Sequence, residues 1–274
     1  MNRRSFLKLG VAGAACHGAV VSSMAGAAAE DITVRGKRVI RECLAAMGGK
    51  AFLAMENRVE EGRAFSFYNE KVSGLSIAKI YTRHVDNPPA GELPVSERQL
   101  FGKDGDFGVL FTGKKEGWDV SYRGARPLPE ATVQRYVESY HHNFFCILRH
   151  RYQEKGLLFE SQGTDVLLND PVEVVDITDA EDRVTTVYIH YSTKLPVRQK
   201  FYRRDPVTKE RREEVSEFSK FRDAGGGVMW PYTIRKTRDG EKLYEIYSDH
   251  VGINQKVPDS LFELPAGVKM LKPV

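Results

Sequence analysis

The sequence predicts an α+β protein that is mostly β: one large curled antiparallel sheet, an open half-barrel of about ten or eleven strands, with two main helices packed in its concave face. Period-two alternation of apolar and polar residues occupies most of the chain after residue 58. Short turns link these segments, which is typical of antiparallel neighbours. Two stretches of helical period, around residues 35–47 and 129–156, interrupt the alternation.

Residues 1–29 have the pattern of a cleaved twin-arginine export signal. Two adjacent arginines precede a Phe-Leu-Lys run, so the signal residues are Arg3, Arg4, Phe6, Leu7 and Lys8. A mildly apolar stretch then closes in small residues at cleavage spacing, namely Ala27, Ala28 and Ala29. We expect a single domain over residues 30–274, exported to the periplasm. Lipid anchoring at Cys16 is an alternative, because Gly13-Ala14-Ala15-Cys16 loosely resembles a lipobox.

The charge balance argues against nucleic acid as a partner. The signal holds three of the 41 basic residues and no acidic one, so the rest of the chain is nearly balanced against 37 acidic residues. No concentrated block of Lys and Arg with interleaved aromatics occurs in it.

The first half of the remaining chain is predicted to be a helix followed by strands. Apolar residues at helical spacing run through 35–47 and stop at Gly48-Gly49, a helix C-terminal signal. Alternating segments separated by turn residues then predict five strands, at residues 59–67, 77–83, 98–103, 107–112 and 118–122.

The second half opens with the clearest helix and continues as a meander. Pro129 begins a helix with an unusually aromatic face, and Gly156 ends it. The strand pattern resumes at Leu157 and continues through residues 172–177, 183–191, 196–204, 211–221, 229–238 and 242–251. The tightest predicted hairpin turn is Asp239-Gly240, between the last two of these strands. Because twist accumulates over so many strands, the sheet must curl, and its concave face is where the helices can bury their apolar stripes.

Several short segments, in order, resemble a known family. They are Ala46-Met47-Gly48-Gly49, Glu61-Gly62, Trp230-Pro231 and the ending from Asn254 to Pro265. In this arrangement the chain resembles the LolA-like periplasmic lipoprotein carriers and the outer-membrane lipoprotein-sorting proteins, which have an open half-barrel closed by helices. The resemblance implies a non-enzymatic carrier or receptor for acyl chains of lipids or lipoproteins. Its partner would be an inner-membrane transporter or an outer-membrane acceptor.

The residues themselves lead to the same expectation. An aromatic helix set against a curled sheet makes an apolar concavity that can hold a lipid tail, at roughly 0.8 kcal/mol per buried CH₂. The candidate cavity residues are Phe65, Phe67, Ile80, Phe111, Tyr136, Tyr140, Phe144, Phe145, Leu148 and Trp230. A closed core made of the same side chains is the alternative, because periodicity reports burial but not empty space.

Catalytic motifs are absent from the sequence. It contains no Gly-x-Ser-x-Gly elbow, no phosphate-binding loop between strand and helix, and no His-Glu-x-x-His, so we predict neither an enzyme nor a cofactor. His142, Cys146 and His150 recur every four residues of the long predicted helix and are a weak metal candidate, because two of them could share an ion. Cys43 and Cys146 both lie on apolar helix faces, which favours free thiols over a disulfide.

Two further functions stay open. One is an envelope sensor or regulatory adaptor on the same fold, binding a membrane protein, for which we expect a dry core and an exposed apolar patch. The other is a periplasmic hydrolase or metal enzyme whose residues converge only in the folded chain.

Overall fold

The computed structural model describes residues 30–103, 105, 107–205 and 208–272. The predicted export signal, its cleavage region and Cys16 lie outside the described residues. Residues from Asp31 onward form a compact unit of their own. None of the described helices is long and apolar enough to cross a membrane.

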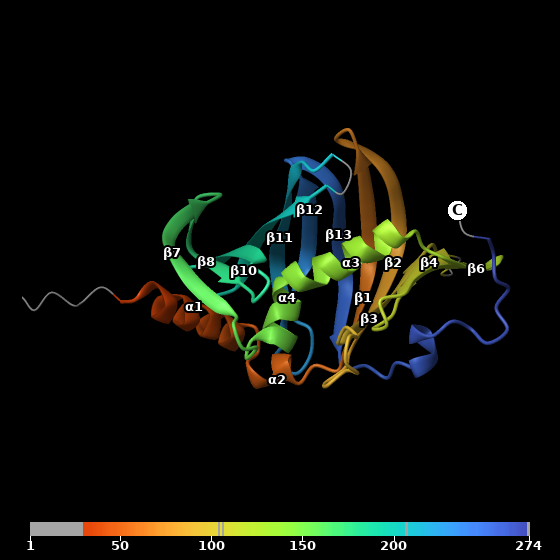
Figure 1. Ribbon diagram of the computed structural model, residues 1–274, viewed down its shortest axis with the longest axis horizontal. Coiled ribbons are helices and arrows are strands. Elements are labelled where there is room, and N and C mark those ends of the chain that lie inside the picture. The colour runs from red at the N-terminus through yellow and green to blue at the C-terminus, as the bar shows by residue number, and fades with distance from the viewer. Residues whose placement is uncertain (1–29, 104, 106, 206–207, 273–274) are drawn as a thin grey trace, which may run out of the picture. The chain divides into compact units, whose positions relative to one another are not determined.

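An antiparallel sheet of 13 strands dominates this unit (Figure 1). Its strands are β1 (Asn57–Tyr68), β2 (Lys71–His84), β3 (Val95–Phe101), β4 (Phe107–Phe111), β5 (Gly117–Ser121), β6 (Gly124–Pro127), β7 (Leu158–Leu167), β8 (Asp170–Thr178), β9 (Val184–His190), β10 (Pro196–Arg204), β11 (Arg211–Asp223), β12 (Met229–Arg238) and β13 (Glu241–Ile253). Their spatial order is β6-β5-β4-β3-β2-β1-β13-β12-β11-β10-β9-β8-β7. Two meanders thus meet where β1 pairs with β13, and β6 and β7 are the free edges.

The predicted sheet is confirmed, and it has more strands than the ten or eleven expected. One unexpected strand is β6, whose four residues are too few to show alternation, although they pair with β5. The first hairpin is also longer than predicted. Asn69 and Glu70 form its turn with φ of 48° and 61°, so β2 begins at Lys71.

The first helix, α1 (Ile32–Ala46), packs against β7 and β8. The carboxylate of Asp31 caps it by accepting from the backbone N–H of Thr33 at 2.8 Å. Its apolar stripe, including Val39 and Ile40, is fully buried. Gly36 permits the close approach, because a Cβ there would lie 2.4 Å from the backbone oxygen of Phe159. A short helix, α2 (Lys50–Leu53), follows, and a 3₁₀ turn, η2 (Asp259–Phe262), lies near the C-terminus.

Replacing Gly36 by alanine should destabilise the protein even though alanine is the better helix former. Helix propensity alone favours Ala by about 1 kcal/mol, whereas the clash with the backbone of β7 should cost about 1–3 kcal/mol. Urea denaturation of Gly36→Ala measures the balance. The matched control is Lys37→Ala at the exposed neighbouring position, with an expected change within about 0.5 kcal/mol. A Gly36→Ala variant that is more stable than the parent, as helix propensity alone would make it, would contradict the close packing of α1 on β7.

The predicted long helix over residues 129–156 is wrong as one continuous element. The chain instead forms α3 (Glu130–His142), α4 (Phe144–Cys146) and a π-helical turn, η1 (Ile147–Arg151). Asn143 causes the break: its backbone is extended, with ψ of 115°, and its side-chain oxygen accepts from the N–H groups of Phe145 and Cys146. As a result α3 crosses the concave side of the sheet, while α4 and η1 enter the core (Figure 1).

The main hydrophobic core lies beneath α1, α4 and η1. Phe144 and Leu148 are fully buried there, together with side chains of β8, β9 and β11 to β13. α3 contributes no residue to this cluster. The core therefore occupies the half of the concave face next to β7, which leaves space under α3.

Candidate functional site: a cavity beneath α3

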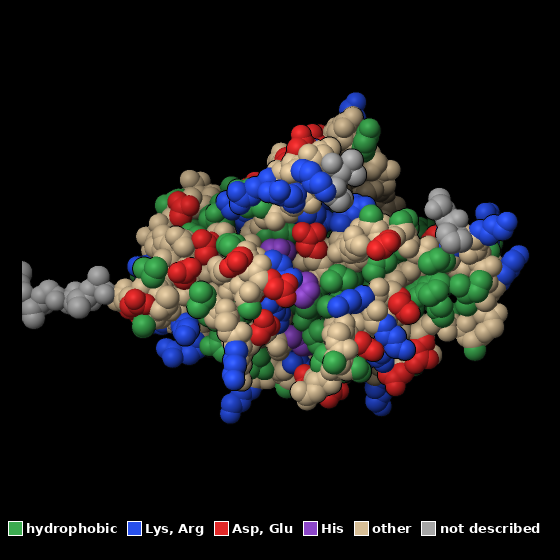
Figure 2. All heavy atoms as spheres, in the orientation of Figure 1, with side chains coloured by type: hydrophobic (Ala, Val, Ile, Leu, Met, Phe, Trp, Pro, Cys, Tyr) green, Lys and Arg blue, Asp and Glu red, His purple; other side chains and the backbone are tan. Residues whose placement is uncertain are grey.

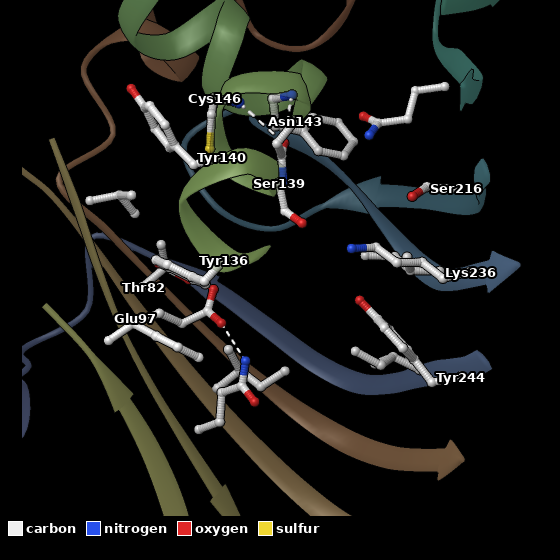
Figure 3. Close-up of a pocket in the computed structure, with 18 of the residues that line it drawn as sticks. Thr82, Glu97, Tyr136, Ser139, Tyr140, Asn143, Cys146, Ser216, Lys236 and Tyr244 are labelled. Atoms are coloured by element: carbon white, nitrogen blue, oxygen red, sulfur yellow. Dashed lines mark hydrogen bonds between the residues drawn. The ribbon is translucent and has the colours of Figure 1, made fainter. Parts of the chain in front are cut away.

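A cavity of about 390 Å³ lies between α3 and the concave face of the sheet. Side chains of α3 and α4 cover it, and β1 to β4 together with β10 to β13 form its wall (Figure 3). Its volume is near the lower end of the range for small-molecule sites, roughly 300–1,000 Å³. The cavity is therefore large enough for one small ligand or one chain.

Six of the ten predicted cavity residues line this space. They are Ile80, Phe111, Tyr136, Tyr140, Phe145 and Trp230. The ring of Tyr136 on α3 stacks on Phe111 of β4, with centroids 3.9 Å apart and planes within 2°. On the other side, Phe145 packs against Trp230 at 4.6 Å. These two aromatic contacts attach the helical cover to the sheet on both sides of the space.

The structure does not bring the other four candidates to the cavity. Phe144 and Leu148 belong to the closed core. Phe65 and Phe67 lie on the convex face, because Glu60 of the same strand faces the cavity and side chains alternate along a strand. The ring of Phe65 meets Tyr247 there, with centroids 5.6 Å apart.

Part of the wall is charged, which the sequence pattern did not predict. The guanidinium of Arg58 lies 4.2 Å above the ring of Trp230 and donates to the hydroxyl of Thr82 at 2.9 Å. Its Nε is 3.6 Å from a carboxylate oxygen of Glu60, a residue only 2% exposed. The alternation Arg58-Val59-Glu60 was a signal that one face of β1 is polar, but it did not indicate which face is concave.

Two ion pairs hold polar side chains near the rim. Arg203 of β10 reaches α3, with its Nε 2.8 Å from Glu138 and its Nη2 donating to the hydroxyl of Ser139 at 3.0 Å. Arg238 of β12 donates to Glu214 of β11 at 2.8 Å. Figure 2 shows Lys and Arg side chains gathered above α3 beside the ends of β10 and β11. Lys200, Arg203, Arg204 and Arg211 line a second pocket at these strands, together with Arg183.

Lys236 of β12 points into the cavity beside Tyr244 (Figure 3). Its ammonium nitrogen lies 5.3 Å from the centroid of the Tyr244 ring, and this neighbour raises the pKa of Lys236. Three other cations of the same wall have carboxylate partners, because ion pairs with glutamates are formed by Arg58, Arg203 and Arg238. Among the described residues, no carboxylate oxygen lies within 4.0 Å of the Lys236 nitrogen.

The weak metal candidate His142, Cys146 and His150 is not assembled. A ring nitrogen of His142 is hydrogen-bonded to the hydroxyl of Thr185 at 2.8 Å, whereas His150 is hydrogen-bonded to His84 at 2.9 Å. The break at Asn143 therefore separates His142 from His150. Within the described ranges, no group of three or more His, Cys, Asp or Glu could hold a metal ion. Cys43 and Cys146 are both free thiols. Burial raises the pKa of Cys146, which lines the cavity, to about 12, so its thiol stays protonated.

An open antiparallel sheet with helices over its concave face and a cavity between them defines a LolA-like fold. No protein-family model matches the sequence, and no curated protein matches it. Solved structures do share the fold. One is a DUF1329 family protein from Desulfovibrio piger, at 12% identity and a TM-score of 0.56, covering 85% of this chain and 98% of that one.

Two further structures carry names from the family that the sequence resembles. A putative outer membrane lipoprotein-sorting protein domain from Vibrio parahaemolyticus has 11% identity and a TM-score of 0.55, covering 84% of this chain and 96% of its own. A LolA superfamily protein from Nitrosomonas europaea has 11% identity and a TM-score of 0.51, with 83% and 97% covered. The predicted resemblance is thus confirmed at the level of the fold.

Proposed function

We propose that this protein is a periplasmic carrier or receptor that holds a lipid, or an acyl chain of a lipid or lipoprotein, in the cavity beneath α3, without catalysis. The cavity itself carries this proposal, because aromatic and aliphatic side chains line an accessible space that the core leaves empty. The fold shared with a lipoprotein-sorting domain supports it. The twin-arginine motif at Arg3-Arg4 supports export.

The size and the wall of the cavity limit the ligand to one chain. About 390 Å³ suits a single acyl chain or a small amphiphile rather than several chains side by side. Apolar side chains such as Ile80 and Phe111 would take up the chain by area burial. Charged side chains share the wall, so a purely hydrocarbon ligand would leave polar groups unsolvated. An amphiphile meets both demands.

Chemical features of the cavity favour binding over turnover. Its thiol, Cys146, has a raised pKa and is a poor nucleophile. The hydroxyl of Ser139 accepts a hydrogen bond from Arg203 and has no histidine partner among the described contacts. These observations support a carrier, because nucleophilic catalysis needs a base beside the nucleophile.

Native mass spectrometry of the exported protein, purified without detergent, tests the proposal. We expect a stoichiometric lipid adduct, and uptake of an added fluorescent fatty acid by the delipidated protein. Ser216→Trp should abolish the uptake, because Ser216 points into the cavity and the indole would fill it (Figure 3). Ser219→Trp is the matched control, on the exposed opposite face of the same strand, and should keep full uptake. A bare protein mass with no uptake would overturn the carrier proposal.

An envelope adaptor is the second candidate, and one observation favours it. Large apolar side chains of β2 are exposed on the convex face, with Val72 at 57%, Leu75 at 62% and Ile77 at 56%. Exposed apolar groups gathered in one place are typical of contact surfaces. The same mass spectrometry separates the two candidates, because an adaptor should carry no lipid. Its affinity for its protein partner should also be unchanged by Ser216→Trp.

A further inference from the structure

A polar row crosses the floor of the cavity from strand to strand. Ser216 of β11 is the cross-strand partner of Lys236, and Lys236 is the partner of Tyr244 on β13. All three side chains line the cavity. Directly opposite residues of neighbouring strands have Cβ atoms about 4.5–5.5 Å apart. An ammonium therefore lies between two hydroxyl groups, all facing the same space (Figure 3).

No carboxylate of the described wall lies within 4.0 Å of the Lys236 ammonium, and Glu214 and Glu97 act on its charge only from farther away. Five basic and three acidic side chains line the cavity. Glu60 pairs with Arg58, and Glu214 pairs with Arg238. The third acidic side chain, Glu97 on β3, accepts from Gln99 at 2.5 Å and lies across the cavity from Lys236 (Figure 3). A half-buried ammonium facing a partly apolar space is poorly solvated, so an anionic ligand group would stabilise it.

We propose that Lys236, with the hydroxyls of Ser216 and Tyr244, binds the anionic headgroup of a single-chain amphiphile whose tail lies against Phe111 and Tyr136. This inference rests on the proposed carrier function and specifies its ligand: a carboxylate or phosphate amphiphile, rather than the uncharged acyl groups of a lipoprotein. Glu97 sets the orientation, because it repels an anion from the far side. The basic side chains beside β10 and β11 would raise the local concentration of such ligands near the cavity (Figure 2).

Paired binding measurements on the exported protein test this assignment. The probes are cis-parinaric acid, a fluorescent single-chain carboxylic acid, and its uncharged methyl ester, both at pH 8. We expect the acid to bind about tenfold or more tightly than the ester, as a charge-assisted hydrogen bond implies. Lys236→Met should remove this preference by weakening acid binding alone. Lys236→Arg keeps the cation and should retain most of the preference.

The controls separate a local effect from general damage. Lys242→Met removes another half-exposed lysine, one that does not line the cavity, and should leave both affinities unchanged. Displacement of the acid by lysophosphatidic acid, in a manner dependent on Lys236, would identify phosphate as the headgroup. No displacement would identify carboxylate.

Two results would count against the proposals in different ways. Equal binding of acid and ester, or a Lys236→Met variant that keeps the preference for the acid, would overturn the anionic headgroup and leave the carrier function standing. Failure of the parent protein to bind the ester, the acid and the phosphate would overturn the carrier function as well.

Discussion

Lowering the pH from 6.5 to 4 is expected to reduce the free energy of unfolding steeply. Burial lowers the pKa of His141, His142 and His150 to about 4, and burial also holds the pKa of His84 well below its ordinary value. Between pH 6.5 and 4 the unfolded chain takes up protons at these sites while the folded chain does not. Their contribution to stability is therefore fully present above pH 6.5 and is lost as the pH falls through this window.

The size of the slope follows from the number of protons. Each histidine can change the free energy of unfolding by up to about 1.4 kcal/mol per pH unit. Several histidines together should therefore account for most of the loss of stability between pH 6.5 and 4. Urea denaturation at half-unit pH steps measures this slope. His142→Gln should flatten it by about one proton, because glutamine can keep a hydrogen bond to Thr185 but cannot be charged. The matched control is His250→Gln, which removes an exposed histidine of β13.

Carboxylates should act in a separate, more acidic range. Two arginines, Arg151 and Arg183, hold the pKa of Asp179 below its ordinary value against the opposing effect of burial. Its contribution is thus present above about pH 4 and is lost only at lower pH. A stability curve that stays flat between pH 6.5 and 4 and falls only below 4 would show that the histidines are not protected as the structure implies.

Arg151→Met should cost about 3 kcal/mol or more of unfolding free energy, the largest expected effect of a single substitution here. Arg151 is 7% exposed and donates to Glu154 at 2.7 and 2.9 Å, to Asp179 at 2.9 Å and to the carbonyl of His141 at 3.1 Å. It joins the end of α3 to η1 and to the β8–β9 turn. Removing one partner of a buried pair leaves the other charge uncompensated, at roughly 3–5 kcal/mol.

Arg183 tempers this loss, because it still donates to Asp179 at 2.8 Å. We therefore expect the lower end of the range, measured by urea denaturation at pH 7. Arg212→Met is the matched control: its ion pairs with Glu210 and Asp239 are exposed, and their loss should cost far less stability than the loss of Arg151. If both variants lost the same small amount, the buried network could not be what fixes η1 against the sheet.

The element types and the sheet were predictable because they rest on local patterns. Alternation in residues 229–238 and helical spacing in 35–47 each bury one face, whatever lies opposite. The break at Asn143 was missed for the same reason: the apolar period continues across it, while the side-chain cap that interrupts the helix depends on the rotamer of one residue.

The candidate site was predictable only in part. Aromatic residues were chosen because they are apolar, and Phe111, Tyr136 and Trp230 do line the cavity. Phe144 has the same local signature and lies in the closed core. The sequence pattern does not single out Lys236 or Arg58, because charges in strands usually face water. Nothing in a linear pattern distinguishes a solvent-facing charge from one that faces a cavity.

Local chemistry along the chain was thus sufficient for most of the strands and for the curled sheet, since each depends on periodicity and on neighbouring residues. The LolA-like arrangement was implied by the resemblance of a few short segments in order. Only the folded sheet decides which face of β1 is concave, which part of that face α4 and η1 fill, and which part remains open beneath α3. These outcomes depend on the direction of curl and on contacts between residues far apart in the chain, such as Tyr136 with Phe111 and Arg203 with Glu138. A cavity is space that packing leaves unfilled, and packing is a property of the whole fold.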